Sequence, residues 1–263
     1  MDKATIDRVC QWLDEARRLV VLTGAGVSAE SGVPTFRDVQ TGLWARFSPE
    51  ELATEAAFRS DPQRVWDWYQ HRRDALLSVR PNAGHMALAH YALRHPGKLM
   101  LVTQNVDGLH QKAGQPHTVT LHGDIAADRW LDEPGACCMA QPPLPGRPPR
   151  CPVCGNLRRP AVVWFGEALP ADALASAERA AADCHLMLVV GTSGVVYPAA
   201  GLVHTASLAG ARVVIVNPEA TVLDDLADAC IRGTSAGTLV QLLETATPPD
   251  MLDRKERTDR WIP

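Results

Sequence analysis

The chain has 263 residues, of which 46% are hydrophobic and 21% are charged, and its formal net charge is −4. This length and composition suit one large domain, or one domain with insertions, with ample material for a core. The slight acidic balance and the lack of a basic run argue against a nucleic-acid partner.

The first segment, MDKATIDRVCQWLDEARR (1–18), mixes charged and apolar residues and predicts a surface helix rather than a signal peptide. The longest charge-free stretch, LMLVVGTSGVVYPAAGLV (186–203), is broken by glycines and a proline, and therefore predicts a strand, a turn and a helix rather than a membrane span. The seven cysteines are an odd number, which favours free thiols and metal over disulfides. We expect a cytoplasmic monomer with no membrane partner.

Four apolar runs recur along the chain, and each precedes a turn and a helical pattern. They are RLVVLTGAG (18–26), KLMLVTQN (98–105), LMLVVGTS (186–193) and RVVIVNPE (212–219). Continuous runs of Val, Leu and Ile that are separated by helices predict a parallel sheet buried on both faces. The predicted fold class is therefore α/β, with a doubly wound, Rossmann-like parallel sheet.

Two segments interrupt this rhythm. Residues 44–83 are helical in pattern, rich in Trp and Arg, and without a strand, whereas residues 124–160 are rich in Pro and Cys and show no periodic element. A long Pro-rich stretch inside a compact domain needs its own organising principle. We interpret the two segments as a helical module and a zinc-ribbon-like module that together form a smaller lobe. The core domain then comprises residues 1–43, 84–123 and 161–263.

The glycine-rich turn TGAGVSAESGVPTFRD (23–38) leaves a predicted strand and enters a helix. Gly24 and Gly26 would let the backbone approach a pyrophosphate at a helix N-terminus, although an ordinary tight turn has the same pattern. An acidic residue that binds the ribose is expected about 20 residues on, where this chain has Arg46, Phe47 and Ser48. An ordinary Rossmann dehydrogenase is therefore disfavoured.

Seven motif blocks follow one another along the chain. They are GAGVSAESGVPTFRD (24–38), TQNVDGLHQKAG (103–114), LHG (121–123), CPVCG (151–155), VVWFGE (162–167), GTS (191–193) and VNPE (216–219), and GTSAGTL (233–239) follows them. In this order they resemble the sirtuins, which are NAD-dependent protein-lysine deacylases. The resemblance implies that the core domain binds NAD. It also implies a reaction in which the acyl oxygen of a modified lysine attacks the ribose carbon that bears nicotinamide, giving lysine, nicotinamide and O-acyl-ADP-ribose.

The resemblance assigns His122 and Asn105 to catalysis. His122 follows the strand-like TVTL (118–121), at the edge where α/β sites gather, and the near-neutral pKa of histidine suits a general base. Gln104, Asn105 and Asp107 would bind nicotinamide and ribose, although Asp107 also suits a helix N-cap. The remaining NAD-binding residues that the resemblance implies are Gly24, Ala25, Gly26, Ser28, Thr35, Phe36, Arg37, Gly191, Thr192, Ser193, Asn217, Glu219 and Ser235.

The motif Cys151-Pro-Val-Cys154-Gly resembles half of a structural zinc site. Sirtuins normally supply a second C-x-x-C soon after the histidine motif, but the corresponding positions here are Trp130 and Glu133. We hypothesise that zinc is retained by Cys137, Cys138, Cys151 and Cys154. The alternative is a site that has lost its metal, in a lobe held by prolines and Trp130.

Tyr69 and Arg72 lie three residues apart in VWDWYQHRRDALL (65–77) and would share one helix face. A planar Arg fork and a Tyr hydroxyl suit a carboxylate, whereas an exposed Arg on an ordinary helix is the plainer interpretation. The YQHR motif resembles the class III sirtuin branch, which removes succinyl, malonyl and glutaryl groups. In that comparison Ala53 leaves room for a longer acyl chain, and Val163 and Phe165 line the lysine tunnel.

The expected partners are therefore acyl-lysine proteins or peptides. Plain deacetylation and ADP-ribosylation are the alternatives within the same framework. An oxidoreductase and a non-catalytic zinc-knuckle module that binds nucleic acid are alternatives from other classes.

Overall fold

A six-stranded parallel sheet forms the centre of the larger lobe, with the strand order β3-β2-β1-β6-β7-β8. The computed structural model describes residues 2–34 and 49–244. The strands are β1 (Leu19–Thr23), β2 (Leu99–Thr103), β3 (Thr118–Thr120), β6 (Leu186–Val190), β7 (Arg212–Val216) and β8 (Ala229–Ile231). The four apolar runs correspond to β1, β2, β6 and β7, so the predicted doubly wound fold is confirmed.

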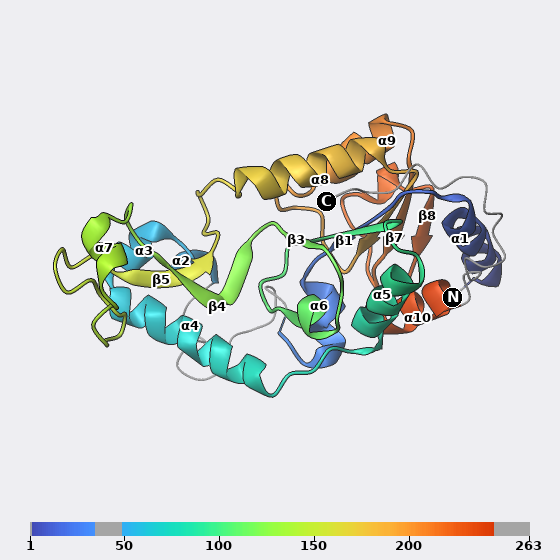
Figure 1. The fold of residues 1–263 in the computed structure, drawn as a ribbon. Helices are drawn as coiled ribbons and strands as arrows, with labels where there is room; N and C mark the ends of the chain where they lie inside the picture. Colours follow the sequence, from blue (N-terminus) through green and yellow to red (C-terminus); the bar gives the residue numbers. More distant parts are fainter. Residues whose placement is uncertain (1, 35–48, 245–263) are drawn as a thin grey trace.

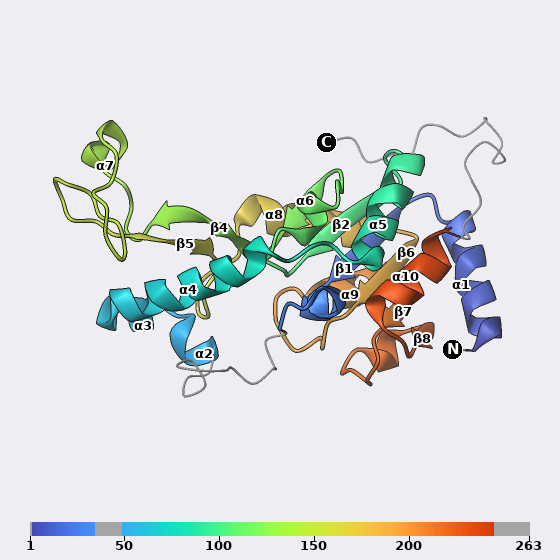
Figure 2. The same cartoon turned by 90° about the horizontal axis from the view of Figure 1, so that it is seen from below.

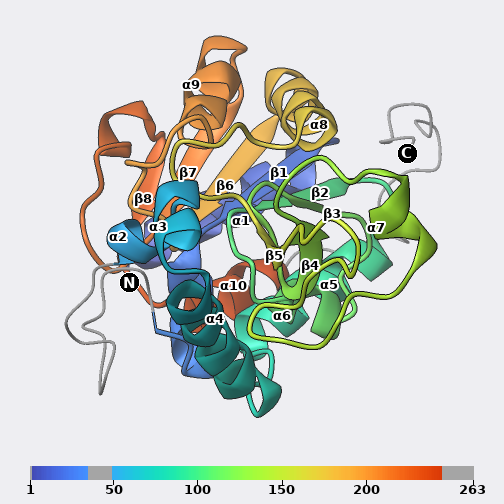
Figure 3. The same cartoon turned by 90° about the vertical axis from the view of Figure 1, so that its left-hand side faces the viewer.

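Helices cover both faces of this sheet, which explains why its central strands β1 and β6 are buried along their whole length (Figure 1, Figure 3). Side chains alternate along a strand, so Val20 and Leu22 face one layer while Leu19 and Val21 face the other. The first layer contains α8 (Ala171–Asp183) and α9 (Gly201–Leu208), and the second contains α1 (Lys3–Glu15), α5 (Ala83–Arg94) and α10 (Ser235–Glu244). No helix in the described part of the chain has the length and apolar character needed to cross a membrane.

The smaller lobe projects from the carboxyl ends of the strands (Figure 1, Figure 2). It contains α2 (Pro49–Leu52), α3 (Glu55–Ser60), α4 (Pro62–Leu77), α7 (Ala136–Ala140) and the antiparallel pair β4 (Gly123–Trp130) and β5 (Arg158–Val162). Its separate core consists of Leu52, Ala53, Phe58, Val65, Trp68, Tyr69, Ile125, Val162 and Trp164.

The expectation that residues 124–160 contain no periodic element is wrong, because β4 and β5 lie at the two ends of that segment and pair with each other. The register shifts between Asp124 and Asp128, and such an irregularity interrupts the alternation that identifies a strand. The strands are also far apart in sequence, so no hairpin turn signals their pairing.

Three short helices follow strands of the sheet and complete its carboxyl edge. The 3₁₀ helix η1 (Ala25–Ser31) follows β1, α6 (Leu109–Lys112) follows β2, and the 3₁₀ helix η3 (Asp224–Leu226) follows β7. They bring polar side chains of distant segments to one edge of the sheet, beside the smaller lobe.

Candidate functional site

The candidate site lies at the carboxyl edge of the sheet. Gly24, Gln104, Gly191 and Asn217 each come directly after the last residue of β1, β2, β6 or β7. These four strands are neighbours and run parallel, so the four residues meet at one edge. Backbone hydrogen bonds link adjacent turns, including Gly24 N to Val190 O at 3.0 Å and Gln104 N to Thr23 O at 2.9 Å.

The glycines of the first turn permit two chain segments to touch. Gly26 N donates to Gly191 O at 2.8 Å. A Cβ at Gly26 would lie 2.8 Å from Gly191 Cα, and one at Gly24 would lie 2.7 Å from Thr192 Cβ. The structure therefore supplies a packing requirement for both glycines, in addition to the pyrophosphate contact that the sequence predicts.

A chain of hydrogen bonds connects Ser28, Asn105 and Asp107. Asn105 Nδ2 donates to Ser28 Oγ at 3.1 Å, and Ser28 Oγ donates to Asp107 Oδ2 at 2.7 Å. The N-cap of α6 is Gly108 rather than Asp107, and Asp107, one residue earlier, accepts from Leu109 N through Oδ1 at 2.9 Å. The two hydrogen bonds of Asp107 use different carboxylate oxygens, so the contact with α6 does not compete with the contact to Ser28.

His122 lies between β3 and β4, and its orientation is set by Gln104. Its Nδ1 is 2.9 Å from Gln104 O, and because a carbonyl only accepts, Nδ1 carries the proton and Nε2 is the acceptor. Burial lowers the pKa of His122, although the Gln104 carbonyl opposes that shift. Gln104 Nε2 in turn donates to Thr192 Oγ1 at 3.1 Å. The imidazole is therefore held neutral at neutral pH, as a general base requires.

Residues 163–165, directly after β5, connect the backbone of His122 with the backbone of Ala53, which lies between α2 and α3. Val163 N donates to His122 O and Phe165 N donates to Ala53 O, both at 2.9 Å. The side chain of Trp164 is buried while that of Phe165 is 46% exposed. Val163 and Phe165 thus lie on a strip of backbone that is hydrogen-bonded to His122 at one end and to Ala53 at the other.

Tyr69 and Arg72 lie on α4 next to this strip. Tyr69 is 4% exposed, and its hydroxyl accepts a hydrogen bond from Trp164 Nε1 at 3.0 Å. Arg72 Cζ lies 5.0 Å from the centroid of the Trp68 ring, whose edge meets Tyr69. Burial lowers the pKa of Arg72 and raises the pKa of Tyr69 to about 12, so at neutral pH the first stays cationic and the second stays protonated. Arg72 is half-buried rather than fully exposed on the helix.

The sulfur atoms of Cys137, Cys138, Cys151 and Cys154 all lie within 4.8 Å of one another. Cys138 Sγ and Cys154 Sγ are 3.5 Å apart, close to the edge of about 3.8 Å that a tetrahedron with Zn–S bonds of about 2.3 Å requires. Backbone N–H groups of Cys154 and Val153 lower the pKa of Cys151 to about 6, which favours the thiolate form that binds metal.

The adjacent cysteines reach the cluster from the single short helix α7, and the other two come from the turn before β5. The four thiols therefore fit a structural zinc site, as hypothesised. The cluster lies at the far end of the smaller lobe, where Figure 1 labels α7, away from the carboxyl edge of the sheet. All seven cysteines of the chain are free thiols.

Known proteins resemble this chain in sequence and in fold. The model of the Sir2 family matches residues 24–198. An NAD-dependent protein deacylase of Ralstonia nicotianae is 58% identical over 230 residues, which are 88% of this chain and 92% of that protein.

The chain belongs to the Sir2 family.

Two further comparisons agree with this assignment. NAD-dependent protein deacylase 1 of Pseudomonas aeruginosa is 50% identical over 247 residues, covering 91% of this chain and 98% of the relative. The crystal structure of a Sir2 homolog–NAD complex has a TM-score of 0.81 at 40% identity and covers 94% of both chains. The resemblance to sirtuins is therefore confirmed.

The geometry joins most of the residues that the sirtuin resemblance selects. Ser28, Asn105 and Asp107 form one hydrogen-bonded group, and His122, Gln104 and Thr192 form a second. Other predicted NAD-binding residues lie along the same edge, among them half-buried Ala25 and Ser193. Asn217 Nδ2 donates to Glu219 O at 2.8 Å. Buried Ser235 donates from Oγ to Gly26 O at 3.4 Å. Thr35, Phe36 and Arg37 lie outside the described residues. The binding roles of all these residues remain predictions.

Two buried histidines behind Ser28 were not selected from the sequence. His85 Nε2 lies 3.5 Å from Ser28 Oγ, and the His85 and His110 ring centroids are 4.8 Å apart. His110 Nε2 is 3.0 Å from Thr23 Oγ1. Burial lowers the pKa of both, to about 3 for His110, so this layer is neutral. His110 belongs to the TQNVDGLHQKAG block, and that membership was the signal available.

Proposed function

We propose that this Sir2 protein removes acidic acyl groups (succinyl, malonyl and glutaryl) from protein lysines in an NAD-dependent reaction. Deacylation itself follows from membership of the family and from close relatives named NAD-dependent protein deacylases. The preference for acidic groups is the finer part of the proposal. The observation that carries it is the pairing of buried Tyr69 with half-buried, cationic Arg72 on α4.

The carboxyl edge of the sheet offers the features that NAD requires. The turn at Gly24 and Gly26 is the place for the pyrophosphate, and Ser28, Asn105 and Asp107 supply donors and acceptors for the nicotinamide amide and the ribose. Bound NAD supplies an electrophilic ribose carbon that receives the acyl oxygen as nicotinamide leaves.

His122 acts as the general base in this proposal. Its Nδ1–H donates to Gln104 O, which leaves Nε2 to remove a proton from a ribose hydroxyl. That hydroxyl then attacks the acyl carbon, the bond from this carbon to the lysine nitrogen breaks, and a water molecule adds to the same carbon. The products are lysine, nicotinamide and O-acyl-ADP-ribose. Because burial lowers the pKa of His122, the base is ready without prior deprotonation at neutral pH.

The acyl preference rests on charge. The carboxylate of a succinyl or malonyl group forms charge-assisted hydrogen bonds with the guanidinium of Arg72, whereas an acetyl methyl group cannot. The small side chain of Ala53, whose backbone oxygen accepts from Phe165 N, matches the class III branch, where a small residue leaves room for a longer acyl chain. Acetyl-lysine is therefore expected to be the poorer substrate.

The test compares one peptide carrying succinyl-, malonyl-, glutaryl- or acetyl-lysine, with NAD present and nicotinamide release as the signal. We expect kcat/KM for the acidic acyl groups to exceed that for acetyl by at least about tenfold, the factor that corresponds to 1.4 kcal/mol. A higher value for acetyl would leave deacetylation as the function. Transfer of label from NAD to protein would instead support ADP-ribosylation.

A further inference from the structure

We propose that Trp164 is a positioning residue for acyl selection: its indole N–H occupies a lone pair of the Tyr69 hydroxyl and so directs the hydroxyl proton toward the acyl carboxylate. This inference rests on the proposed acidic preference. It assigns a role to a residue that touches neither NAD nor the acyl group in the scheme above.

Within the described residues, the hydrogen-bond partner of the Tyr69 hydroxyl is a donor, and the nearby carboxylate of Glu167 is engaged by Trp164 N, Arg129 and Arg159. Trp164 Nε1 donates to Tyr69 Oη at 3.0 Å, and an indole N–H cannot accept in return. The positive charges of Arg72, one turn further along α4, and of Arg159 both act to lower the pKa of Tyr69, and a guanidinium cannot accept a hydrogen bond. Because burial raises the pKa of Tyr69 to about 12, the hydroxyl retains its proton and needs an acceptor. A carboxylate that pairs with Arg72 is an acceptor of the right charge.

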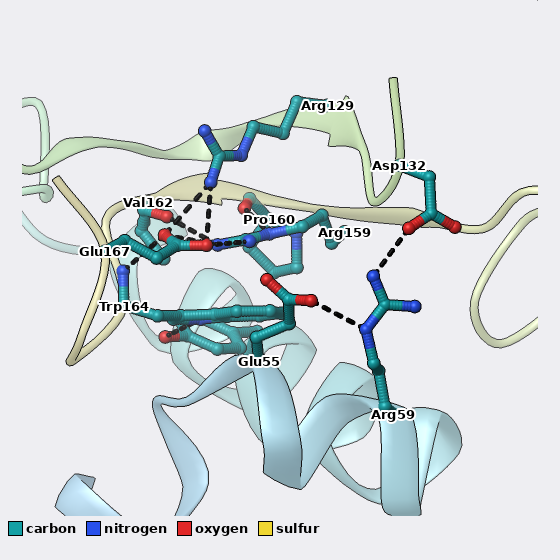
Figure 4. A network of polar contacts seen from close by, with 10 residues as sticks. Glu55, Arg59, Arg129, Asp132, Arg159, Pro160, Val162, Trp164 and Glu167 are labelled. Atoms are coloured by element: carbon teal, nitrogen blue, oxygen red, sulfur yellow. Dashed lines mark hydrogen bonds and ion pairs between the residues drawn. The ribbon is translucent and has the colours of Figure 1, made fainter. Parts of the chain in front are cut away.

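The Trp164 indole is fixed by a buried ion pair (Figure 4). Arg159 is 1% exposed, and its Cζ lies 3.2 Å from the centroid of the Trp164 ring. The same guanidinium pairs with Glu167 and donates to Val162 O at 2.8 Å. Glu167 Oε2 accepts from Trp164 N at 2.8 Å, so Glu167 holds the backbone of Trp164 while Arg159 covers its ring.

Two further contacts restrict the side chains of Glu167 and Trp164. Figure 4 shows Arg129 reaching Glu167 from the neighbouring strand, at 3.0 Å from both carboxylate oxygens. Phe58 packs against the indole with its ring centroid 5.3 Å away. A buried ion pair contributes little net stability compared with apolar packing. We therefore ascribe the ion pair between Arg159 and Glu167 to the orientation of the Trp164 N–H.

The test is the variant Trp164→Phe, which removes the N–H and retains an aromatic ring beneath Arg159. We expect kcat/KM for the succinyl peptide to fall roughly three- to tenfold, mainly through KM, while the value for the acetyl peptide changes less than about twofold. Tyr69→Phe should cost less in the Trp164→Phe background than in the parent, because the two substitutions remove one linked pair of hydrogen bonds. Trp130→Phe is the matched control, since Trp130 also lies beside a guanidinium, with Arg158 Cζ 4.9 Å from its ring.

Equal losses for both acyl groups, or additive effects of the two substitutions, would overturn the positioning role. If the parent enzyme prefers succinyl and loses that preference in Arg72→Met but keeps it in Trp164→Phe, this inference fails while the proposed function stands. If the parent prefers acetyl, the proposed function fails first.

A second measurement needs no tryptophan variant, in case Trp164→Phe does not fold. In protein labelled with ¹⁵N-tryptophan, the indole N–H resonance that moves furthest in Tyr69→Phe is assigned to Trp164, whose Nε1 donates to the hydroxyl that is removed. We expect it to shift when the succinyl peptide binds and to shift less with the acetyl peptide, because donation by the hydroxyl strengthens the bond it accepts. Identical shifts with both peptides would contradict the proposal.

Discussion

Replacing Arg72 with Met tests the origin of the acyl preference. The substitution keeps an unbranched stem against Trp68 and removes the charge and the planar fork. Hydrogen bonds between charged partners contribute about 1.5–3 kcal/mol. The loss of that contact corresponds to a decrease of roughly 10- to 150-fold in kcat/KM for succinyl-lysine.

The same substitution should leave acetyl-lysine turnover unchanged or slightly improved. An acetyl group makes no ion pair with Arg72, and removing a partly buried cation also removes its desolvation cost. The expected outcome is therefore a change in the succinyl-to-acetyl ratio rather than a general loss of activity.

The assay measures kcat/KM for both peptides in the parent, Arg72→Met and Arg72→Lys. The lysine variant keeps the charge without the bidentate fork, so we expect an intermediate loss. Arg64→Met is the matched control, because Arg64 lies in the first turn of α4 and pairs with Asp61 at 3.6 Å. Equal losses of succinyl and acetyl turnover in Arg72→Met would refute the charge argument.

Other predictions concern the base, the metal and the core. In the pH profile of kcat/KM, the apparent pKa of the acid limb should lie below the ordinary histidine value of about 6.5, because burial lowers the pKa of His122 and only the neutral imidazole acts as a base. An apparent pKa above that value would contradict the assignment of His122. Purified protein should contain close to one zinc per chain, and a chelator should lower its melting temperature; a metal content far below one would contradict the four-thiol site. The free energy of unfolding should fall as the pH drops from about 6.5 toward 3, because His110 binds a proton in the unfolded chain and stays neutral in the folded one. The expected contribution of His110 is about 1.4 kcal/mol per pH unit. A stability that does not change with pH in this range would contradict the buried, neutral state of His110. Gly26→Ala should destabilise by about 1–3 kcal/mol because its Cβ would meet Gly191, whereas Gly237→Ala, at an exposed position of α10, should be neutral or stabilising; calorimetry separates the two outcomes.

The predictable part of the fold is the part whose side chains are buried on both faces. Runs such as LVVLT in β1 and RVVIV in β7 identify themselves, because a central parallel strand leaves no face for polar residues. β4 gave no such signal, since it reads GDIAADRW and only Ile125 is buried. Its pairing with β5 depends on contacts from elsewhere, including Arg73, which donates to Ile125 O and pairs with Asp128.

The site could be predicted where its residues follow strands in recognisable blocks. His122 and Asn105 are of this kind, because their motifs fix their place at the carboxyl edge. The contact between Trp164 and Tyr69 joins residues 95 positions apart, and no local pattern encodes it. Arg72 was ambiguous for the same reason: an arginine on a helix is usually exposed, and only the position of Trp68 and the lobe's core makes this one half-buried.

A competition experiment tests the central claim most directly. Equal amounts of succinyl- and acetyl-lysine forms of one peptide are mixed with the enzyme and limiting NAD, and both peptides and both O-acyl-ADP-ribose products are followed by mass spectrometry. If the guanidinium of Arg72 selects the acyl group, the succinyl peptide disappears first and O-succinyl-ADP-ribose accumulates in step with nicotinamide. Prior consumption of the acetyl peptide would contradict that selection.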